Sequence, residues 1–277
     1  MSTKANLRVF RGDANGGKLE AYEVETYPGM VVLDAIHEIQ AKQEPTLAVR
    51  WNCKAGRCGS CSAEINGKPR LMCMTRMSHL AEDKPVTVTP MRAFPVLKDL
   101  VCDVGFNFAM AKKIPPFKPR PRESDGTHRM LQEDIDRIQE FRKCIECFLC
   151  QDVCHVLRDH KKAEFAGPRF LIHLATLDMH PLDTLDRRDM VKDDFKVGLC
   201  NITKCCSEVC PEGIHITDNG IIPLKERVVD DYYDPVAWLT RRVRRGPAKE
   251  KAVSPLLDAT TATTVAATPV AKRGQGE

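Results

Sequence analysis

The chain has 277 residues, of which 43% are hydrophobic, and 42 Lys and Arg against 38 Asp and Glu give a net charge of +4. This length allows one large domain or two ordinary ones, and a charge this close to neutral argues against nucleic acid as a partner. No apolar run approaches the roughly 18 residues that cross a bilayer. Because no signal or transit peptide precedes the first strand-like segment, we expect a bacterial cytoplasmic protein that is soluble or peripheral to a membrane.

The first part of the chain predicts a small β-grasp domain. Two β-favouring runs flank a glycine-rich turn, which indicates a hairpin, and Val31 to Gln40 has apolar residues at helical spacing. The expected strands lie within residues 7–10, 21–25, 62–67 and 86–89. One helix packed across a mixed sheet is therefore expected, and we place this domain at residues 1–104.

The first cysteine group lies inside this domain. Cys53, Cys58 and Cys61 have the spacing C-x4-C-x2-C, and Cys73 follows. This is the plant-type spacing for a 2Fe-2S cluster, and Gly56 and Gly59 permit the unusual backbone angles that a loop around sulfides needs. A zinc site also uses four thiolates, but usually as two C-x2-4-C pairs, so it is the weaker interpretation.

The second part of the chain predicts a mainly α-helical domain, placed at residues 105–245. The first expected helix occupies Phe94 to Lys113 and holds Cys102 as a buried, structural thiol. A proline-rich stretch at residues 115–121 then forms a stiff connector. Further helices are expected within residues 130–141, 170–177 and 221–229. Residues 246–277 are rich in Ala, Thr, Pro and Lys, which predicts a flexible or partner-ordered tail.

Two cysteine runs with one spacing occupy this helical domain. The first is Cys144, Cys147, Cys150 and Cys154, and the second is Cys200, Thr203, Cys206 and Cys210. In bacterial two-cluster ferredoxins the last cysteine of each run ligates the cluster of the other run. This rule predicts a 4Fe-4S cluster on Cys144, Cys147, Cys150 and Cys210. The other set, Cys154, Cys200 and Cys206, has three thiolates, which suits a 3Fe-4S cluster.

Two 4Fe-4S clusters are the alternative, since Cys205 lies two residues from Thr203. We expect the Cys205 side chain to point elsewhere, because it is adjacent to the ligand Cys206. The eight histidines form no metal-binding pair with a carboxylate, and the sequence contains no nucleophile elbow, P-loop or dinucleotide fingerprint. We therefore expect no catalytic residue in this chain.

Four segments together resemble the iron–sulfur subunit of succinate dehydrogenase and fumarate reductase. They are residues 53–61 (CKAGRCGSC), 98–101 (KDLV), 144–147 (CIEC) and 210–214 (CPEGI), and the resemblance covers roughly residues 5–240. It implies an α+β chain whose 2Fe-2S domain faces an FAD-bearing flavoprotein subunit. It also implies a 3Fe-4S cluster that faces a quinone and a membrane anchor, and an anchor of this kind can hold haem.

The resemblance is incomplete at the expected quinone contacts. Members with a ubiquinone pocket carry Pro and paired Trp after the first run and a His in the second, whereas this chain has His155, Arg158, Asp159 and Asn201. We therefore expect menaquinone or a further cofactor in the anchor. Peripheral attachment to the cytoplasmic face of the bacterial inner membrane is also expected. Arg241 to Arg245 could contact anionic lipid there; a solvated charge run, or one paired with a partner subunit, is the alternative.

Three clusters in one chain predict a one-electron relay that joins two two-electron reactions. The resemblance assigns this relay to a membrane-bound succinate:quinone oxidoreductase whose substrate chemistry occurs on the flavoprotein. One alternative is a free-standing ferredoxin-like carrier, although a diffusing carrier needs little more than its cluster fold. Another is the same relay in a fumarate reductase or another flavin-dependent reductase complex.

Overall fold

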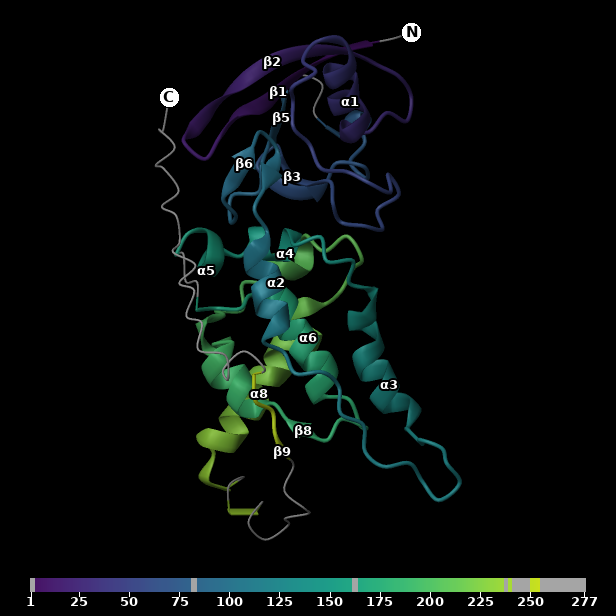
Figure 1. Cartoon of the computed structure of the whole chain (residues 1–277), viewed down its shortest axis with the longest axis vertical. Coiled ribbons are helices and arrows are strands. Elements are labelled where there is room, and N and C mark those ends of the chain that lie inside the picture. Colours follow the sequence, from purple (N-terminus) through teal and green to yellow (C-terminus); the bar gives the residue numbers. More distant parts are fainter. Residues whose placement is uncertain (1–2, 81–83, 161–163, 237–238, 241–249, 255–277) are drawn as a thin grey trace.

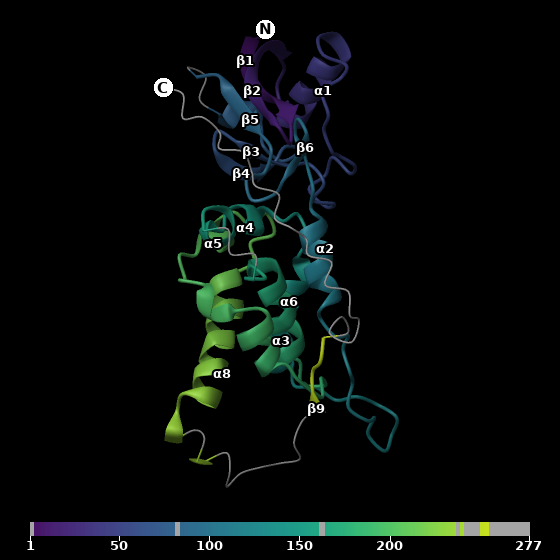
Figure 2. The ribbon, with the colours of Figure 1, turned by 60° about the vertical axis from the view of Figure 1, so that its left-hand side comes forward.

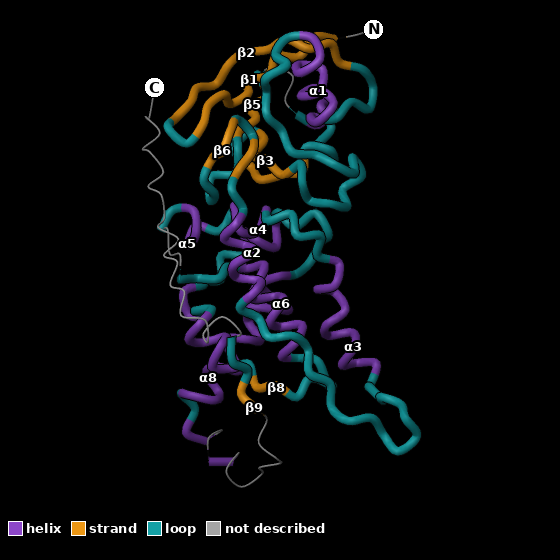
Figure 3. The backbone as a smooth tube through the Cα atoms, viewed as in Figure 1, coloured by secondary structure: helices purple, strands orange, loops and turns teal. Residues whose placement is uncertain are grey.

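The computed structural model of the chain describes residues 3–80, 84–160, 164–236, 239–240 and 250–254. A sheet domain with one long helix is stacked end to end on a helical domain (Figure 1). Among the described residues, strands are concentrated in the first domain, and the short pair β8 (Leu185–Asp186) and β9 (Glu250–Lys251) lies among the helices of the second (Figure 3). This division confirms the predicted α+β class.

The first domain has the predicted mixed sheet. β1 (Thr3–Asp13) and β2 (Gly16–Thr26) form a long antiparallel hairpin, and β1 runs parallel to β5 (Val86–Thr89). The strand order is β4-β3-β5-β1-β6-β7, with β2 paired to β1. The remaining strands are β3 (Ser62–Ile65), β4 (Lys68–Leu71), β6 (Val96–Lys98) and β7 (Val101–Cys102).

The predicted helix across this sheet is α1 (Val32–Lys42), and a short 3₁₀ turn, η1 (Met77–His79), follows β4. Ile36 and Ile39 of α1 are fully buried against Leu7 and Val88 of the sheet. Burial of side chains of this size stabilises the domain by roughly 1.5–3 kcal/mol each. The helical spacing of apolar residues in α1 thus correctly predicted which face enters the core.

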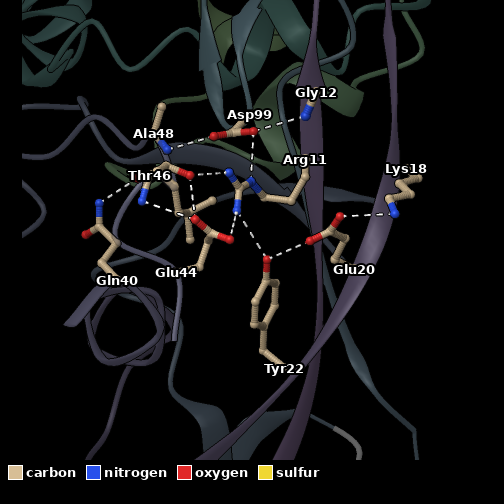
Figure 4. Close-up of polar contacts among 11 residues, drawn as sticks. Arg11, Gly12, Lys18, Glu20, Tyr22, Gln40, Glu44, Thr46, Ala48 and Asp99 are labelled. Atoms are coloured by element: carbon tan, nitrogen blue, oxygen red, sulfur yellow. Dashed lines mark hydrogen bonds and ion pairs between the residues drawn. The ribbon is translucent and has the colours of Figure 1, made fainter. Parts of the chain in front are cut away.

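The expected helix from Phe94 to Lys113 is wrong in its first half. Residues 96–102 form the strands β6 and β7, and α2 extends only over Gly105–Lys112. Asp99 has left-handed backbone geometry (φ 49°) between the two strands. Its carboxylate accepts hydrogen bonds from the backbone N–H of Gly12 and Ala48 and from Nε of Arg11, at 2.8–3.0 Å (Figure 4). These distant partners hold residues 96–102 against the sheet, which local periodicity could not predict. Cys102 is buried, on β7 rather than on a helix.

The second domain is a compact set of short helices around an apolar core. Phe165, Phe170 and Phe195 are almost completely buried there. The predicted helices at 130–141, 170–177 and 221–229 correspond to α3 (Gln132–Gln139) with η2 (Glu140–Lys143), to α6 (Pro168–Asp178) and to α8 (Ile222–Tyr232). The α-helices after α2 are α3 (Gln132–Gln139), α4 (Leu149–Asp152), α5 (His155–Arg158), α6 (Pro168–Asp178), α7 (Cys205–Glu208) and α8 (Ile222–Tyr232). Single turns of 3₁₀ or π type are η2 (Glu140–Lys143), η3 (Met190–Asp194), η4 (Val197–Leu199) and η5 (Ile216–Ile221).

The connector after α2 is fixed to the helical domain by one buried arginine. Arg187 has no exposed side-chain area and donates to the backbone oxygens of Pro115 and Pro116, at 2.9 and 3.0 Å. Its Nε pairs with Oδ2 of Asp183 at 2.8 Å. The connector therefore runs along the outside of the second domain, as the turned view shows (Figure 2).

Part of the predicted tail lies in the described ranges. β9 (Glu250–Lys251) pairs in parallel with β8 (Leu185–Asp186), and the Ala252 N–H donates to the Asp186 oxygen at 2.8 Å. Residues 241–249, which include the run Arg241 to Arg245, and residues 255–277 lie outside the described residues. Within the described residues, no helix has the length and apolar character needed to cross a membrane.

Candidate iron–sulfur cluster sites

The first cysteine group lies in a loop whose backbone N–H groups are aimed at sulfur. The N–H groups of Ala55 and Arg57 lie 3.4 and 3.3 Å from Cys53 Sγ, and that of Cys53 lies 3.5 Å from Cys58 Sγ. Left-handed geometry at Lys54 (φ 54°) and Gly56 (φ 67°) curls the loop inward. Such N–H groups stabilise thiolate charge, as an iron–sulfur cluster requires.

The thiols of this loop differ in acidity. Burial opposes ionisation of Cys58, but the N–H groups of Cys53 and Ser60 outweigh it and lower the pKa of Cys58 to about 6. Burial raises the pKa of Cys61 to about 12, and the neighbouring thiols Cys73 and Cys58 add to this effect. Several thiolates gathered in one loop need a compensating positive charge, which bound ferric iron would supply.

The two later cysteine runs share one backbone conformation. Glu146 and Phe148 are left-handed (φ 56° and 60°) in the first run, as are Ile202 and Lys204 (φ 60° and 61°) at the matching positions of the second. The helices α4 and α7 begin directly after these turns. Thr203 therefore occupies the position in the second run that Cys147 occupies in the first.

Four of the thiols surround one small cavity between α4, α6 and the loop after α7. They are Cys144, Cys147, Cys150 and Cys210. Burial raises the pKa of Cys147 to about 12 and that of Cys150 well above its usual value, and the neighbouring thiols of the set add to both shifts. Arg169 also lines the cavity, and its charge partly offsets the raised pKa of Cys144. The fold thus brings Cys210 to the first run, in the arrangement that the exchange rule predicts.

The remaining thiols form another group, near the contact between α4 and α7. Burial raises the pKa of Cys154 and of Cys206 to about 11, and each is raised further by the charges of Cys200 and Cys205. Thr203 is exposed beside this group, and the neighbouring Ile202 is also exposed. The three thiols and the threonine therefore form a site that reaches the surface.

The expectation that Cys205 points away from Thr203 is wrong. Cys205 Sγ lies 3.2 Å from the Thr203 hydroxyl and 3.7 Å from the backbone oxygen of Val153. Lys204, between these two residues in the sequence, has left-handed backbone geometry and turns the chain so that the two side chains meet. Cys205 is consequently a neighbour of the third site.

Contacts between the first loop and the first run join the two domains. A Cβ added at Gly59 would lie 2.6 Å from Cys147 Cα, so the loops are in direct backbone contact. The Ser62 hydroxyl lies 2.9 Å from the backbone oxygen of Cys147. Cys147 and Leu149 moreover pack into the apolar core of the first domain. No sequence spacing reveals this contact, because residues 59–62 and 147–149 are far apart in the chain.

The chemistry of the three donor sets fits iron–sulfur clusters. The first set lies in a loop whose N–H groups point at sulfur, and the second lines a cavity. In the third set, the N–H groups of Val156 and Leu157 bond to Cys154. A single metal ion is a different arrangement. Among the described residues, no three His, Cys, Asp or Glu side chains are arranged around one ion, as the zinc alternative requires.

Two domain families match the chain. A 2Fe-2S iron–sulfur cluster binding domain matches residues 6–108, and a 4Fe-4S dicluster domain matches residues 140–214. The two matches follow the division between the sheet domain and the helical domain.

Relatives with assigned names are similar over most of the chain. A fumarate reductase iron–sulfur subunit of Mycobacterium tuberculosis is 34% identical over 200 residues, which are 70% of this chain and 80% of the relative. A succinate dehydrogenase iron–sulfur subunit of Bacillus subtilis is 30% identical over 214 residues, or 72% and 81% of the two chains. Among solved structures, a chain of the Mycobacterium smegmatis Sdh1 complex in the apo form is 64% identical. It superposes with a TM-score of 0.82 over 85% of this chain and 100% of its own length.

Proposed function

This chain belongs to the iron–sulfur subunits of succinate dehydrogenase and fumarate reductase, and from that membership we propose how its residues carry electrons through the complex. It is the electron-relay subunit of a succinate/fumarate oxidoreductase, and iron–sulfur clusters are its cofactors. The substrate chemistry takes place on a flavoprotein partner. The proposal concerns the cluster ligands, the path between them and the acceptor.

We assign the 2Fe-2S cluster to Cys53, Cys58, Cys61 and Cys73, and the 4Fe-4S cluster to Cys144, Cys147, Cys150 and Cys210. The 3Fe-4S cluster is assigned to Cys154, Cys200 and Cys206. Bound clusters supply carriers that accept and release one electron at a time. The protein holds the thiolates, excludes water from most of them by burial, and fixes the order of the three sites.

The order of the sites is the observation that carries the proposal. The first loop contacts the first run at Gly59 and Cys147. In turn α4, which carries Cys150, packs against α7, which carries Cys206. The four-cysteine cavity thus lies between the two other groups. Both end groups approach the surface, beside Trp51 (47% exposed) at one end and Ile202 (40% exposed) at the other. Electrons would enter at one exposed end and leave at the other.

The partners follow from this polarity. Membership of the complex implies a flavoprotein and a membrane anchor, and we propose that the 2Fe-2S loop faces the flavoprotein while the surface around Thr203 faces the anchor. The chain would then be attached peripherally at the cytoplasmic face of the bacterial inner membrane. Support comes from the exposure of residues at both ends of the cysteine series.

We further propose menaquinone as the acceptor. The surface beside the third site is polar: His155 and His160 of the α5 region are in edge contact at 5.8 Å, and Arg158 pairs with Asp159 at 3.2 Å. This surface lacks the Pro and paired Trp of the ubiquinone-type members. Turnover of the purified complex with menaquinone and ubiquinone analogues tests the choice, and efficient turnover with ubiquinone alone would overturn it.

Redox-titrated EPR of the intact complex tests the relay itself. The proposal predicts three separate cluster signals, including that of an oxidised 3Fe-4S cluster. Deleting the chain should abolish succinate-dependent dye reduction by membranes. A purified monomer without flavin or membrane partner would instead favour the free-standing carrier, and unchanged dye reduction after the deletion would favour another reductase complex.

A further inference from the structure

A buried hydroxyl lies next to one thiol of the third site. Thr217, in η5, is 1% exposed, and its Oγ1 lies 3.3 Å from Cys206 Sγ. Thr217 is eleven residues beyond Cys206 in the chain. Within the described residues of the second domain, no other proposed cluster ligand has a hydroxyl within hydrogen-bond distance of its sulfur.

A second hydroxyl determines where the Thr217 proton points. Ser207 Oγ accepts a hydrogen bond from the Thr217 N–H at 3.0 Å and lies 3.3 Å from Thr217 Oγ1, to which it donates. A hydroxyl has one proton to donate and two lone pairs. Since Thr217 Oγ1 accepts from Ser207, its own proton is directed to the remaining neighbour, Cys206 Sγ.

The chemistry of a cluster ligand removes the remaining ambiguity. A cysteine bound to iron is a thiolate without a proton, so Cys206 Sγ could only accept. The chain of hydrogen bonds then runs in one direction, from Ser207 to Thr217 to Cys206. Burial of Thr217 protects this chain from competition by water.

We propose that Thr217, positioned by Ser207, is a redox-tuning residue that raises the reduction potential of the third cluster by donating a hydrogen bond to Cys206. This inference rests on the proposed assignment of Cys206 as a cluster ligand. Reduction adds one negative charge to a cluster, and a hydrogen bond to its sulfur stabilises the more negative state. A higher potential at the exit end of the relay draws electrons from the middle site.

The test is an EPR-monitored redox titration of the intact complex with matched variants. Thr217→Val removes the hydroxyl but keeps the branched shape, and Thr217→Ser keeps the hydroxyl. We expect Thr217→Val to lower the reduced fraction of the third cluster at fixed potential, by up to about tenfold, which equals 59 mV for a one-electron couple. Thr217→Ser should leave it close to the wild type.

Further variants keep the test decisive if Thr217→Val fails to assemble. Ser207→Ala releases the Thr217 hydroxyl from its fixed orientation, so a smaller shift in the same direction is expected. Thr176→Val is the control, because the Thr176 hydroxyl donates to the Ile172 oxygen within its own helix, α6. The potentials of the other two clusters serve as internal references and should stay unchanged.

The outcomes separate this inference from the assignment beneath it. If the wild-type complex gives no 3Fe-4S signal, the ligand assignment fails. If the signal is present but its potential is the same in Thr217→Val, or in Ser207→Ala where only that variant assembles, the tuning role of Thr217 is wrong.

Discussion

The Ser62 hydroxyl lies 2.9 Å from the backbone oxygen of Cys147 and also 2.9 Å from that of Gly59. Ser62 begins β3, whereas Cys147 belongs to the first run of the helical domain. One buried side chain thus joins the loop of the first cluster site to a proposed ligand of the second. The spacing of these two sites is determined by this packing, which is why the domain contact matters for electron transfer.

The close contact at Gly59 predicts that an added methyl group destabilises the protein more at this position than at Gly67. Gly59 (φ 67°) and Gly67 (φ 73°) are both left-handed, but an added Cβ meets Cys147 only at Gly59, since nothing lies within 4 Å at Gly67. Both alanine variants have the left-handed strain of about 1–2 kcal/mol. Gly59→Ala adds overpacking of about 1–3 kcal/mol. Thermal unfolding followed by cluster absorbance should therefore show a lower Tm for Gly59→Ala than for Gly67→Ala, and equal values would contradict the contact.

The hydrogen bonds of Asp99 predict that the protein loses stability in acid. Burial opposes its charge, but the N–H groups of Ala48 and Gly12 and the Arg11 guanidinium outweigh it, so the pKa of Asp99 is below its usual value. A lowered folded-state pKa gives stability that is present above the unfolded pKa of about 3.9 and lost as pH falls through the folded value. Asp99→Asn should lower the free energy of unfolding at neutral pH by about 1–3 kcal/mol.

The difference between wild type and Asp99→Asn should shrink in acid, because protonation removes the same interactions from the wild type. Urea unfolding at neutral pH and at about pH 2, well below the unfolded pKa of Asp99, measures this. Asp103→Asn is the control, since Asp103 is exposed and accepts one bond from the Gly105 N–H. A constant difference between wild type and Asp99→Asn at all pH values would show that the charge of Asp99 is unimportant.

The buried contacts of Arg187 predict that replacing this residue strongly destabilises the second domain. Replacing it by Met leaves Asp183 without its buried cationic partner and frees the oxygens of Pro115 and Pro116. Breaking a buried pair in this way costs about 3–5 kcal/mol. Arg188 is a matched control, because it is partly exposed and pairs with Asp186 and Asp231. Denaturant unfolding should separate Arg187→Met clearly from Arg188→Met, and similar midpoints would contradict the role of Arg187.

Much of this fold follows from local patterns in the sequence. The hairpin of β1 and β2 and the helices α1, α6 and α8 lie where β-favouring runs or helical spacing predict them. The spacing of the two cysteine runs also predicts that Cys210 joins the first run, and Cys210 does line the cavity of Cys144, Cys147 and Cys150. The two runs moreover form the same pair of left-handed turns. Such features depend on residues that are near in sequence or on a repeated unit.

The features that the sequence did not reveal depend on distant partners. Asp99 turns residues 96–102 into strands through Arg11 and Ala48, and Arg187 fastens a connector more than 70 residues away. The Thr217 hydroxyl likewise reaches Cys206 only because η5 folds back onto α7. Periodicity carries no information on contacts of this kind, so the tuning and positioning residues appear only in the structure.

The position of Thr203 predicts that the single substitution Thr203→Cys changes the type of cluster at the third site. It occupies the position of Cys147 in a backbone of the same shape, between the left-handed residues Ile202 and Lys204. Thr203→Cys therefore adds a fourth thiolate where the first run has one, and a complete set suits a 4Fe-4S cluster. We expect the EPR signal of the oxidised 3Fe-4S cluster to disappear and an additional reduced-state signal to replace it.

Cys205→Ser is the variant that makes this prediction sharp. Cys205 Sγ is 3.2 Å from the Thr203 hydroxyl, close enough to compete as the fourth ligand. If Thr203 marks a three-thiolate site, Cys205→Ser retains the 3Fe-4S signal of the wild type. If the wild type instead lacks that signal and Cys205→Ser creates it, Cys205 is itself a ligand, and the third site holds a 4Fe-4S cluster with a shifted loop. EPR of the two variants beside the wild type therefore identifies which residue completes the third site.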